Sequence, residues 1–158
     1  MAAFRLTSPA FDDAGPIPDA HTGWGEDRSP PLQWEGVPEG TQELVLVCED
    51  PDADEGVLTH WLAYGIPPDV DGLPEGLPRS AVIQEPVEVV QGLNEFGEVG
   101  YVGPQREEAE DRGPHRYFFR LHALDVELLD VPPGVTREEL RASAKGHVIE
   151  STEFVGIA

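Results

Sequence analysis

Residues that can hold an anion or move a proton stand at the ends of apolar segments of the chain. Asp50 and Asp52 follow one such segment, and His60 opens the next. His115 and Tyr117 are two residues apart, so in an extended strand their side chains share a face. Two imidazoles and a phenol can donate several hydrogen bonds to one anion, and histidine becomes cationic on modest acidification. These residue types indicate an anion site, provided that the fold brings the separate strand ends together.

The two aspartates need another role, because a carboxylate repels an anion. Either can accept a hydrogen bond from a histidine, which fixes the ring tautomer and stabilises its charged form, or bind the amine of a zwitterionic head group. Asp50 and Asp52 lie on the same side if the chain stays extended through Pro51. Gly103, followed by Pro104, lets a backbone N–H approach a ligand closely because it has no Cβ. Taken singly, each of these residues also fits an ordinary turn or strand end.

Signatures of the common cofactor and nucleophile sites are absent from the sequence. It has no Gly-x-Gly-x-x-Gly, no Walker loop, no His-Glu-x-x-His and no Gly-x-Ser-x-Gly. A single cysteine, Cys48, excludes an internal disulfide and any multi-cysteine zinc site. We therefore predict that the protein needs no cofactor.

The charge of the chain disfavours two classes of partner. Its 158 residues include 10 Lys+Arg and 31 Asp+Glu, a net charge of −21. Such a surface repels phosphate backbones and anionic lipid faces, so we expect no nucleic-acid partner.

The types of charged residue also bear on the environment of the protein. Lys145 is the only lysine, and an acidic, lysine-poor surface suits a halophile, because the screening length shortens to ~3 Å at 1 M salt. A GC-rich genome is the alternative explanation.

Length and hydropathy bound the organisation of the protein. The length suits one domain, residues 1–158. The longest aliphatic stretch, residues 44–48, is far shorter than the ~20 residues of a membrane helix, so we expect no stable membrane insertion. The first residues have no apolar core of an export signal, which favours a cytoplasmic location.

Apolar runs predict the strands that must position the polar residues. The 17 glycines and 16 prolines make a helical bundle improbable. Pro86 indicates an edge or a bulge in one of the runs. The predicted strands span residues 43–48, 61–66, 81–90, 115–125 and 147–157.

One short helix is predicted near the C-terminus. Thr136 and Glu139 form a capping box, with Thr136 as the N-cap. Leu140 and Ala144 make an apolar i, i+4 pair, and Gly146 is suited to end the helix. We expect this helix to cover one edge of the sheet. The fold class is therefore all-β: β-rich with minor helices.

An ordered set of motifs resembles the phosphatidylethanolamine-binding protein family, specifically its bacterial and archaeal Raf-kinase-inhibitor-like branch. The motifs are Asp50-Pro51-Asp52-Ala53, His60-Trp61, Gly100-Tyr101-x-Gly103-Pro104 and Gly113-Pro114-His115-Arg116-Tyr117, with further similarity at residues 29–34, 92–97 and 146–148. The resemblance implies a large antiparallel sheet flanked by a smaller one, and a compact pocket for a phosphate-like anion. The pocket residues that it implies are Asp50, Asp52, His60, Gly103, Pro104, His115 and Tyr117.

The sequence departs from this family pattern at two places. Asp54 stands where the family usually has proline after Asp-Pro-Asp-Ala. Residues 105–112 hold four acids and two arginines where the family commonly has a short, proline-rich loop. At low ionic strength this acidic segment should weaken anion capture, and strong salt should screen the penalty.

These observations favour a binding module over an enzyme. The expected partner is a small anionic ligand, either a phosphate-like group or a phospholipid head group. The resemblance also implies a protein partner, a kinase or protease that the protein inhibits, and a homodimer as one arrangement. The alternative is a hydrolase in which Asp50 or His115 acts as general base on water. A divalent-metal site on the same carboxylates and histidines ranks last.

Overall fold

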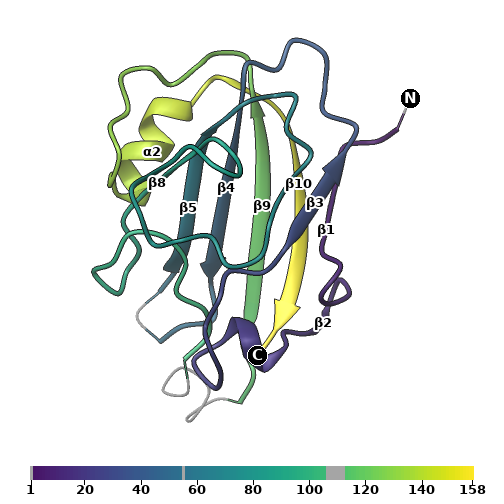
Figure 1. Ribbon diagram of the computed structural model, residues 1–158, viewed down its shortest axis with the longest axis vertical. Coiled ribbons are helices and arrows are strands. Elements are labelled where there is room, and N and C mark those ends of the chain that lie inside the picture. Colours follow the sequence, from purple (N-terminus) through teal and green to yellow (C-terminus); the bar gives the residue numbers. More distant parts are fainter. Residues whose placement is uncertain (1, 55, 106–112) are drawn as a thin grey trace.

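Two β-sheets packed face to face make up most of the protein. The computed structural model describes residues 2–54, 56–105 and 113–158. In this part of the chain, a seven-stranded sheet is crossed on one side by a three-stranded sheet and partly covered on the other by the helix α2 (Arg137–Ala144), while a short 3₁₀ turn, η1, spans Asp19–His21 (Figure 1). The predicted β-rich class, with a large sheet flanked by a smaller one, is confirmed.

The large sheet has the strand order β2-β10-β9-β4-β5-β8-β7. All neighbours pair antiparallel except β10 and β2, which are parallel. Its strands are β2 (Gly15–Pro16), β4 (Glu43–Asp50), β5 (Leu58–Ile66), β7 (Val82–Ile83), β8 (Val89–Gln91), β9 (Arg116–Leu124) and β10 (Val148–Ile157). The predicted strand at 81–90 is two short strands, β7 and β8, on either side of Pro86, and β7 is an edge strand of the sheet, as the proline indicated.

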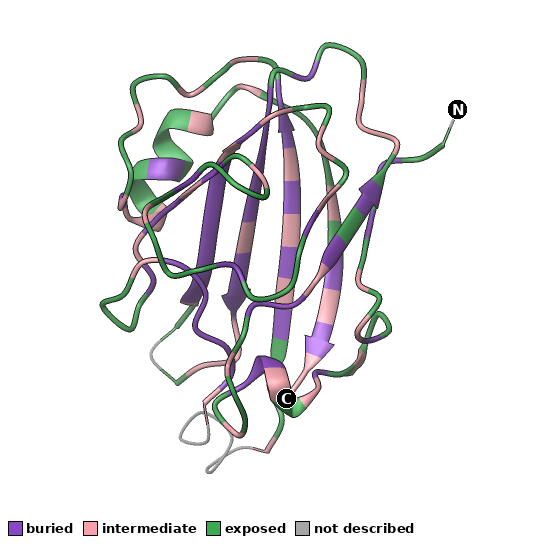
Figure 2. Cartoon of the chain, viewed as in Figure 1, coloured by how far each residue is buried: buried purple, intermediate pink, exposed green. Residues whose placement is uncertain are grey.

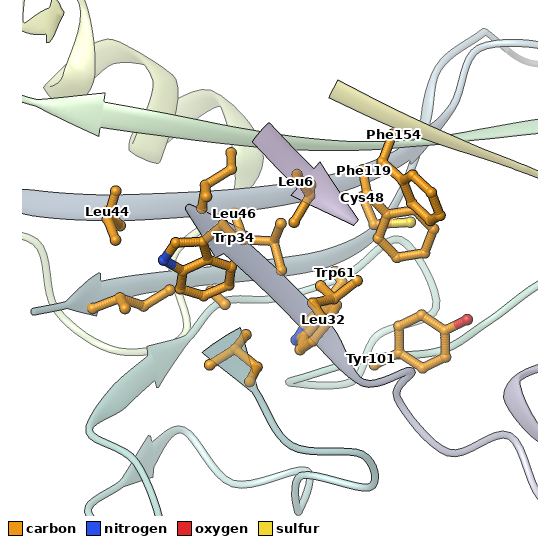
Figure 3. Packing of buried hydrophobic residues seen from close by; sticks show 14 of the residues in the cluster. Leu6, Leu32, Trp34, Leu44, Leu46, Cys48, Trp61, Tyr101, Phe119 and Phe154 are labelled. Atoms are coloured by element: carbon orange, nitrogen blue, oxygen red, sulfur yellow. The ribbon is translucent and has the colours of Figure 1, made fainter. Parts of the chain in front are cut away.

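The small sheet supplies the cover for one face of the large sheet. Its strands are β1 (Arg5–Thr7), β3 (Leu32–Glu35) and β6 (Gly72–Leu73), in the order β1-β3-β6. Leu6 and Trp34 are buried while their strand neighbours are exposed, as the two-residue period of a strand requires. Figure 3 shows Leu6 and Trp34 close to Leu46 of the large sheet, and Leu32 close to Trp61, within one buried cluster. Each aliphatic side chain buried in this way contributes about 1.5–3 kcal/mol.

The helix α2 covers part of the opposite face. Its capping box is confirmed: Thr136 Oγ1 accepts the Glu139 N–H at 3.2 Å, and the Glu139 carboxylate accepts the Thr136 N–H at 3.2 Å. Leu140 is buried against Val45 and Leu62 of central strands. The expectation that this helix covers a sheet edge is therefore wrong, because its apolar side packs on β4 and β5. Figure 2 shows the outward side of α2 exposed. Among the described residues, no helix has the length and hydropathy to cross a membrane.

Candidate functional site

A buried contact joins two strand ends that are far apart in the sequence. Asp50 ends β4, and His115 immediately precedes β9, the neighbouring strand. His115 Nδ1 lies 2.6 Å from Asp50 Oδ2, and the two residues are 3% and 0% exposed. Because a carboxylate accepts, His115 Nδ1 carries the proton in this contact. The backbone also holds His115 in place, since its N–H donates to the Ala158 carbonyl at 2.6 Å.

The other ring nitrogen of His115 is buried without a hydrogen-bond partner among the described residues. Asp50 fixes the tautomer, so Nε2 accepts a hydrogen bond in the neutral ring and donates one in the protonated ring. A buried polar atom left unsatisfied costs about 1–3 kcal/mol. Nε2 is therefore the atom of this cluster that a ligand can satisfy.

His60 faces this cluster because of a β-bulge in β5. Cys48 of β4 pairs with Trp61, and the next β4 residue pairs with Thr59, so His60 is an extra residue in β5. A bulge locally breaks the alternation of side chains between the two faces. His60 and Trp61, although adjacent, both pack on the side of the sheet that carries Tyr117 and the main core.

The described contacts of His60 hold its ring in place. It is 0% exposed, and its Nδ1 lies 2.5 Å from the carbonyl oxygen of Val102, to which it donates. The ring centroid is 5.1 Å from that of Tyr117, edge to face. Tyr117, itself buried, lies nearly parallel to the His115 ring at 6.4 Å. The phenol ring thus lies beside both imidazoles, and the structure brings Asp50 together with these three predicted site residues.

Asp52 is held differently from Asp50. The chain turns after β4, and the Asp52 N–H donates to Asp50 Oδ1 at 2.8 Å, so the chain does not stay extended through Pro51. The Asp52 carboxylate accepts two hydrogen bonds from the Arg116 guanidinium, at 3.0 and 2.8 Å, and one from the Arg116 N–H at 2.9 Å. These hydrogen bonds from Arg116 lower the pKa of Asp52 to about 2.

The two aspartates therefore have separate roles. Asp50 accepts a hydrogen bond from a histidine, as the sequence indicated. Asp52 accepts hydrogen bonds from Arg116, the residue that follows His115. In the contacts that the structure describes, the Asp52 carboxylate accepts hydrogen bonds from the Arg116 guanidinium rather than from a histidine. Asp52 instead positions the first residue of β9.

Gly103 and Pro104 lie in a buried segment beside His60. The Gly103 N–H, predicted to approach a ligand, donates to Asp27 Oδ1 at 2.9 Å, so this expectation does not match the structure. A Cβ at Gly103 would clash with the backbone carbonyl oxygen of His21, and it would lie 2.6 Å from Tyr101 Oη and 2.7 Å from Asp27 Oδ1, which explains why glycine is required here. The Pro104 carbonyl accepts the Gly23 N–H at 2.8 Å. Both residues are structural neighbours of the cluster in this arrangement.

Sequence reasoning missed Asp27 and did not single out Phe96. Asp27 has a φ of +56° and lies far from any strand end, so no sequence signal pointed to it.

Phe96 lies against the buried His60. Its ring centroid is 5.0 Å from that of His60, and the residue is 38% exposed. Asn94 shapes its turn, since its side-chain oxygen accepts the Phe96 N–H at 2.9 Å. An apolar ring thus reaches the surface directly beside a buried imidazole.

Two expectations from the sequence concern other features of this region. Apart from Gln105, the acidic segment 105–112 lies outside the described residues. In the described part of the chain, no group of three or more histidine, cysteine, aspartate or glutamate side chains is arranged to hold a metal ion. The Asp50 and His115 side chains bind each other instead.

Residues 7–158 match the family model described as phosphatidylethanolamine-binding protein. A UPF0098 protein of Methanothermobacter thermautotrophicus is 44% identical over 153 residues, which cover 97% of each chain. A UPF0098 protein of Pyrococcus abyssi is 41% identical over 150 residues, covering 95% of this chain and 82% of the relative. These names state no ligand or activity.

Two solved structures share the fold over nearly their whole length. A putative phosphatidylethanolamine-binding protein homolog from Chlamydia trachomatis has a TM-score of 0.86 and 38% identity, covering 100% of this chain and 98% of that one. YbcL of E. coli, described as a member of the mammalian PEBP family, has a TM-score of 0.87 and 29% identity, covering 99% and 98%. The likeness therefore includes both sheets and the strand ends at which the cluster forms.

Proposed function

Because this chain belongs to the phosphatidylethanolamine-binding protein family, we propose that it binds a small anionic group at the cluster of Asp50, His60, His115 and Tyr117. The ligand is phosphate-like: a free phosphate or the phosphoryl part of a head group. The observation that carries this proposal is the buried Nε2 of His115, which has no hydrogen-bond partner among the described residues. An anion that accepts a hydrogen bond from this atom removes the energetic penalty of its burial.

Asp50 prepares His115 for such a ligand. Its carboxylate holds Nδ1–H, so that protonation adds a donor at Nε2 and a positive charge to the ring. Binding a dianion then favours the imidazolium over the neutral ring, so binding is coupled to the uptake of a proton. Affinity should increase as the pH falls from 8 to 5.5. Sulfate is the preferred probe for this measurement, because its charge is constant in that range whereas that of phosphate changes.

The chain contains a matched control for this site. His147 and Asp125 also form a histidine–aspartate pair, with His147 Nδ1 3.0 Å from Asp125 Oδ1, but their side chains are 43% and 53% exposed. Titration with sulfate and phosphate, followed by NMR of the imidazole nitrogens, should shift the His115 and His60 signals and leave those of His147 in place. His115→Gln should abolish the response, whereas His147→Gln should not. Saturating anion that leaves both buried rings unchanged would contradict the proposal.

The same experiment distinguishes the sources of the anion. Phosphoethanolamine that binds more tightly than phosphate supports a head-group ligand, since the added amine then finds an acceptor. Equal affinities support a phosphoryl site alone, which is the arrangement a protein would use to mask a phosphorylated kinase or protease partner. Competition between a phosphoserine peptide and sulfate for the site directly tests whether it binds such a phosphorylated partner.

A hydrolase is the second candidate, favoured by the Asp50–His115 pair. A histidine that is held by a carboxylate, and whose other nitrogen has no hydrogen-bond partner in the described part of the chain, is the arrangement of a general base that activates water. A panel of phosphomonoesters and carboxylic esters should then be cleaved by the native protein and at least a hundredfold more slowly by His115→Gln. Equal rates for the two proteins would exclude this candidate.

A further inference from the structure

A groove of about 850 Å³ lies on the face of the large sheet opposite the main core, between α2 and the strands beside it. Val45 and Val47 of β4 and Leu62 of β5 form its apolar floor. Leu140 and Ala144 line it from α2. This size falls within the range of small-molecule sites, about 300–1,000 Å³.

Basic residues line both sides of this groove. Arg137, Arg141 and Lys145 follow one another at intervals of four residues, so they form a row along one side of α2 and its C-cap. Arg120 and His122, two residues apart on β9, line the opposite side. The groove thus gathers four of the ten Lys+Arg residues of a chain whose net charge is −21, against two acidic lining residues, Glu49 and Glu138.

Two of these cations are already engaged and two are not. Arg120 and Arg137 both bind Glu49, Arg137 through an Nε–Oε2 contact of 2.7 Å, and Arg120 also binds a glutamate of β10 at 2.9 Å. Arg141 and Lys145 are exposed and form no ion pair within the part of the chain that the structure describes. The engaged pair fixes α2 to the sheet, and the other two leave positive charge at the rim.

We propose that this groove binds a single-chain anionic amphiphile, a carboxylate of the fatty-acid type. Its alkyl chain would lie on Val45, Val47 and Leu62, and its carboxylate would pair with Arg141 and Lys145. Charge complementarity selects this occupant, because a cationic rim around an apolar floor is the inverse of the acidic surface elsewhere. A second copy of the chain fits less well, since it would bring its own charge of −21 to the contact.

Decanoate and 1-decanol, which share a chain length and differ in charge, are the probes. At low ionic strength decanoate should shift the NMR signals of the Val45 and Val47 methyl groups, with an affinity at least tenfold above that of decanol. Arg141→Glu should lower decanoate affinity about tenfold or more. Arg5→Glu, on the exposed side of β1, changes the net charge equally and should leave the affinity nearly unchanged.

Several results would overturn this proposal. They are the absence of decanoate binding, equal affinity for decanol, or an equal loss in Arg141→Glu and Arg5→Glu. If decanoate fails to bind and Arg141→Glu instead changes the molecular mass measured by analytical ultracentrifugation, the groove is an interface between copies. Circular dichroism verifies that both exposed substitutions preserve the fold. His115→Gln should leave decanoate binding intact, which separates the outcome here from that for the buried anion site.

Discussion

The two faces of the large sheet carry polar residues in opposite ways. On the face toward the small sheet, Asp50, His60, His115 and Tyr117 are buried, and hydrogen bonds or ring contacts fix their positions. On the face toward α2, the basic residues stand at the surface around an apolar floor. Ligand binding by a buried polar cluster depends on the geometry of single hydrogen bonds, whereas binding at an exposed basic rim depends mainly on local charge. Substitutions should therefore affect the two faces independently.

The largest effect confined to one face is expected from Gly103→Ala. The added Cβ would meet the His21 backbone carbonyl as well as the Tyr101 hydroxyl and the Asp27 carboxylate, so the segment that binds His60 must shift. We expect a loss of about 3 kcal/mol in the free energy of unfolding, with weaker sulfate binding and unchanged decanoate binding. Urea denaturation measures the first effect. Gly40→Ala is the control, because its φ is +87° with no atom within 4 Å, and strain alone should cost about 1 kcal/mol.

A smaller effect is expected from Asp50→Asn, which retains shape and removes charge. An amide in place of the carboxylate ends the charge-assisted hydrogen bond to His115 Nδ1, which is worth about 1.5–3 kcal/mol. Sulfate affinity should fall about ten- to a hundredfold. Isothermal titration calorimetry measures this loss, and NMR reports the tautomer of His115. Asp125→Asn, at the exposed pair, is the matched substitution, and an equal loss there would show that burial of the pair is irrelevant.

The smallest effect is expected from Arg116→Gln, at the exposed border of the buried cluster. Arg116 holds the pKa of Asp52 at about 2, below its ordinary value of 3.8. A carboxyl whose pKa is lowered in the folded state contributes stability above the unfolded pKa, and this contribution disappears as the pH falls through the folded pKa. The urea midpoints of the variant and native proteins should differ at pH 6 and converge near pH 2. A difference that stays constant over this range would show that the ion pair is not its origin.

Much of the fold was predictable because local patterns encode it. The apolar runs ending at Cys48 and Ile66 became β4 and β5, and the strand predicted from His115 became β9. The capping box at Thr136 formed as predicted. The prediction that His115 and Tyr117 share a face agrees with their nearly parallel rings. Periodicity and capping act within a few residues, so they can be read without knowledge of the fold.

The details of the candidate site were less accessible. The bulge that turns His60 toward Tyr117 arises from the pairing of β4 with β5, and no pattern within β5 indicates it. Asp50 and Asp52 have the same residue type, yet the turn after β4 gives one to His115 and the other to Arg116. Asp27 takes the Gly103 N–H across a separation of 76 residues. Each outcome depends on which segments, distant in the sequence, become neighbours in the fold.

Residue order was enough to identify the all-β class, the family and the residue types available for binding an anion, because each of these rests on local patterns or on motifs spread along the chain. Tertiary packing alone decided which nitrogen of His115 lies buried without a hydrogen-bond partner among the described residues, which aspartate holds the ring, and where the basic residues of α2 meet an apolar floor. The reason is physical: the energies of hydrogen bonds and ion pairs depend on distance, direction and burial, and these quantities exist only when segments distant in the sequence come into contact.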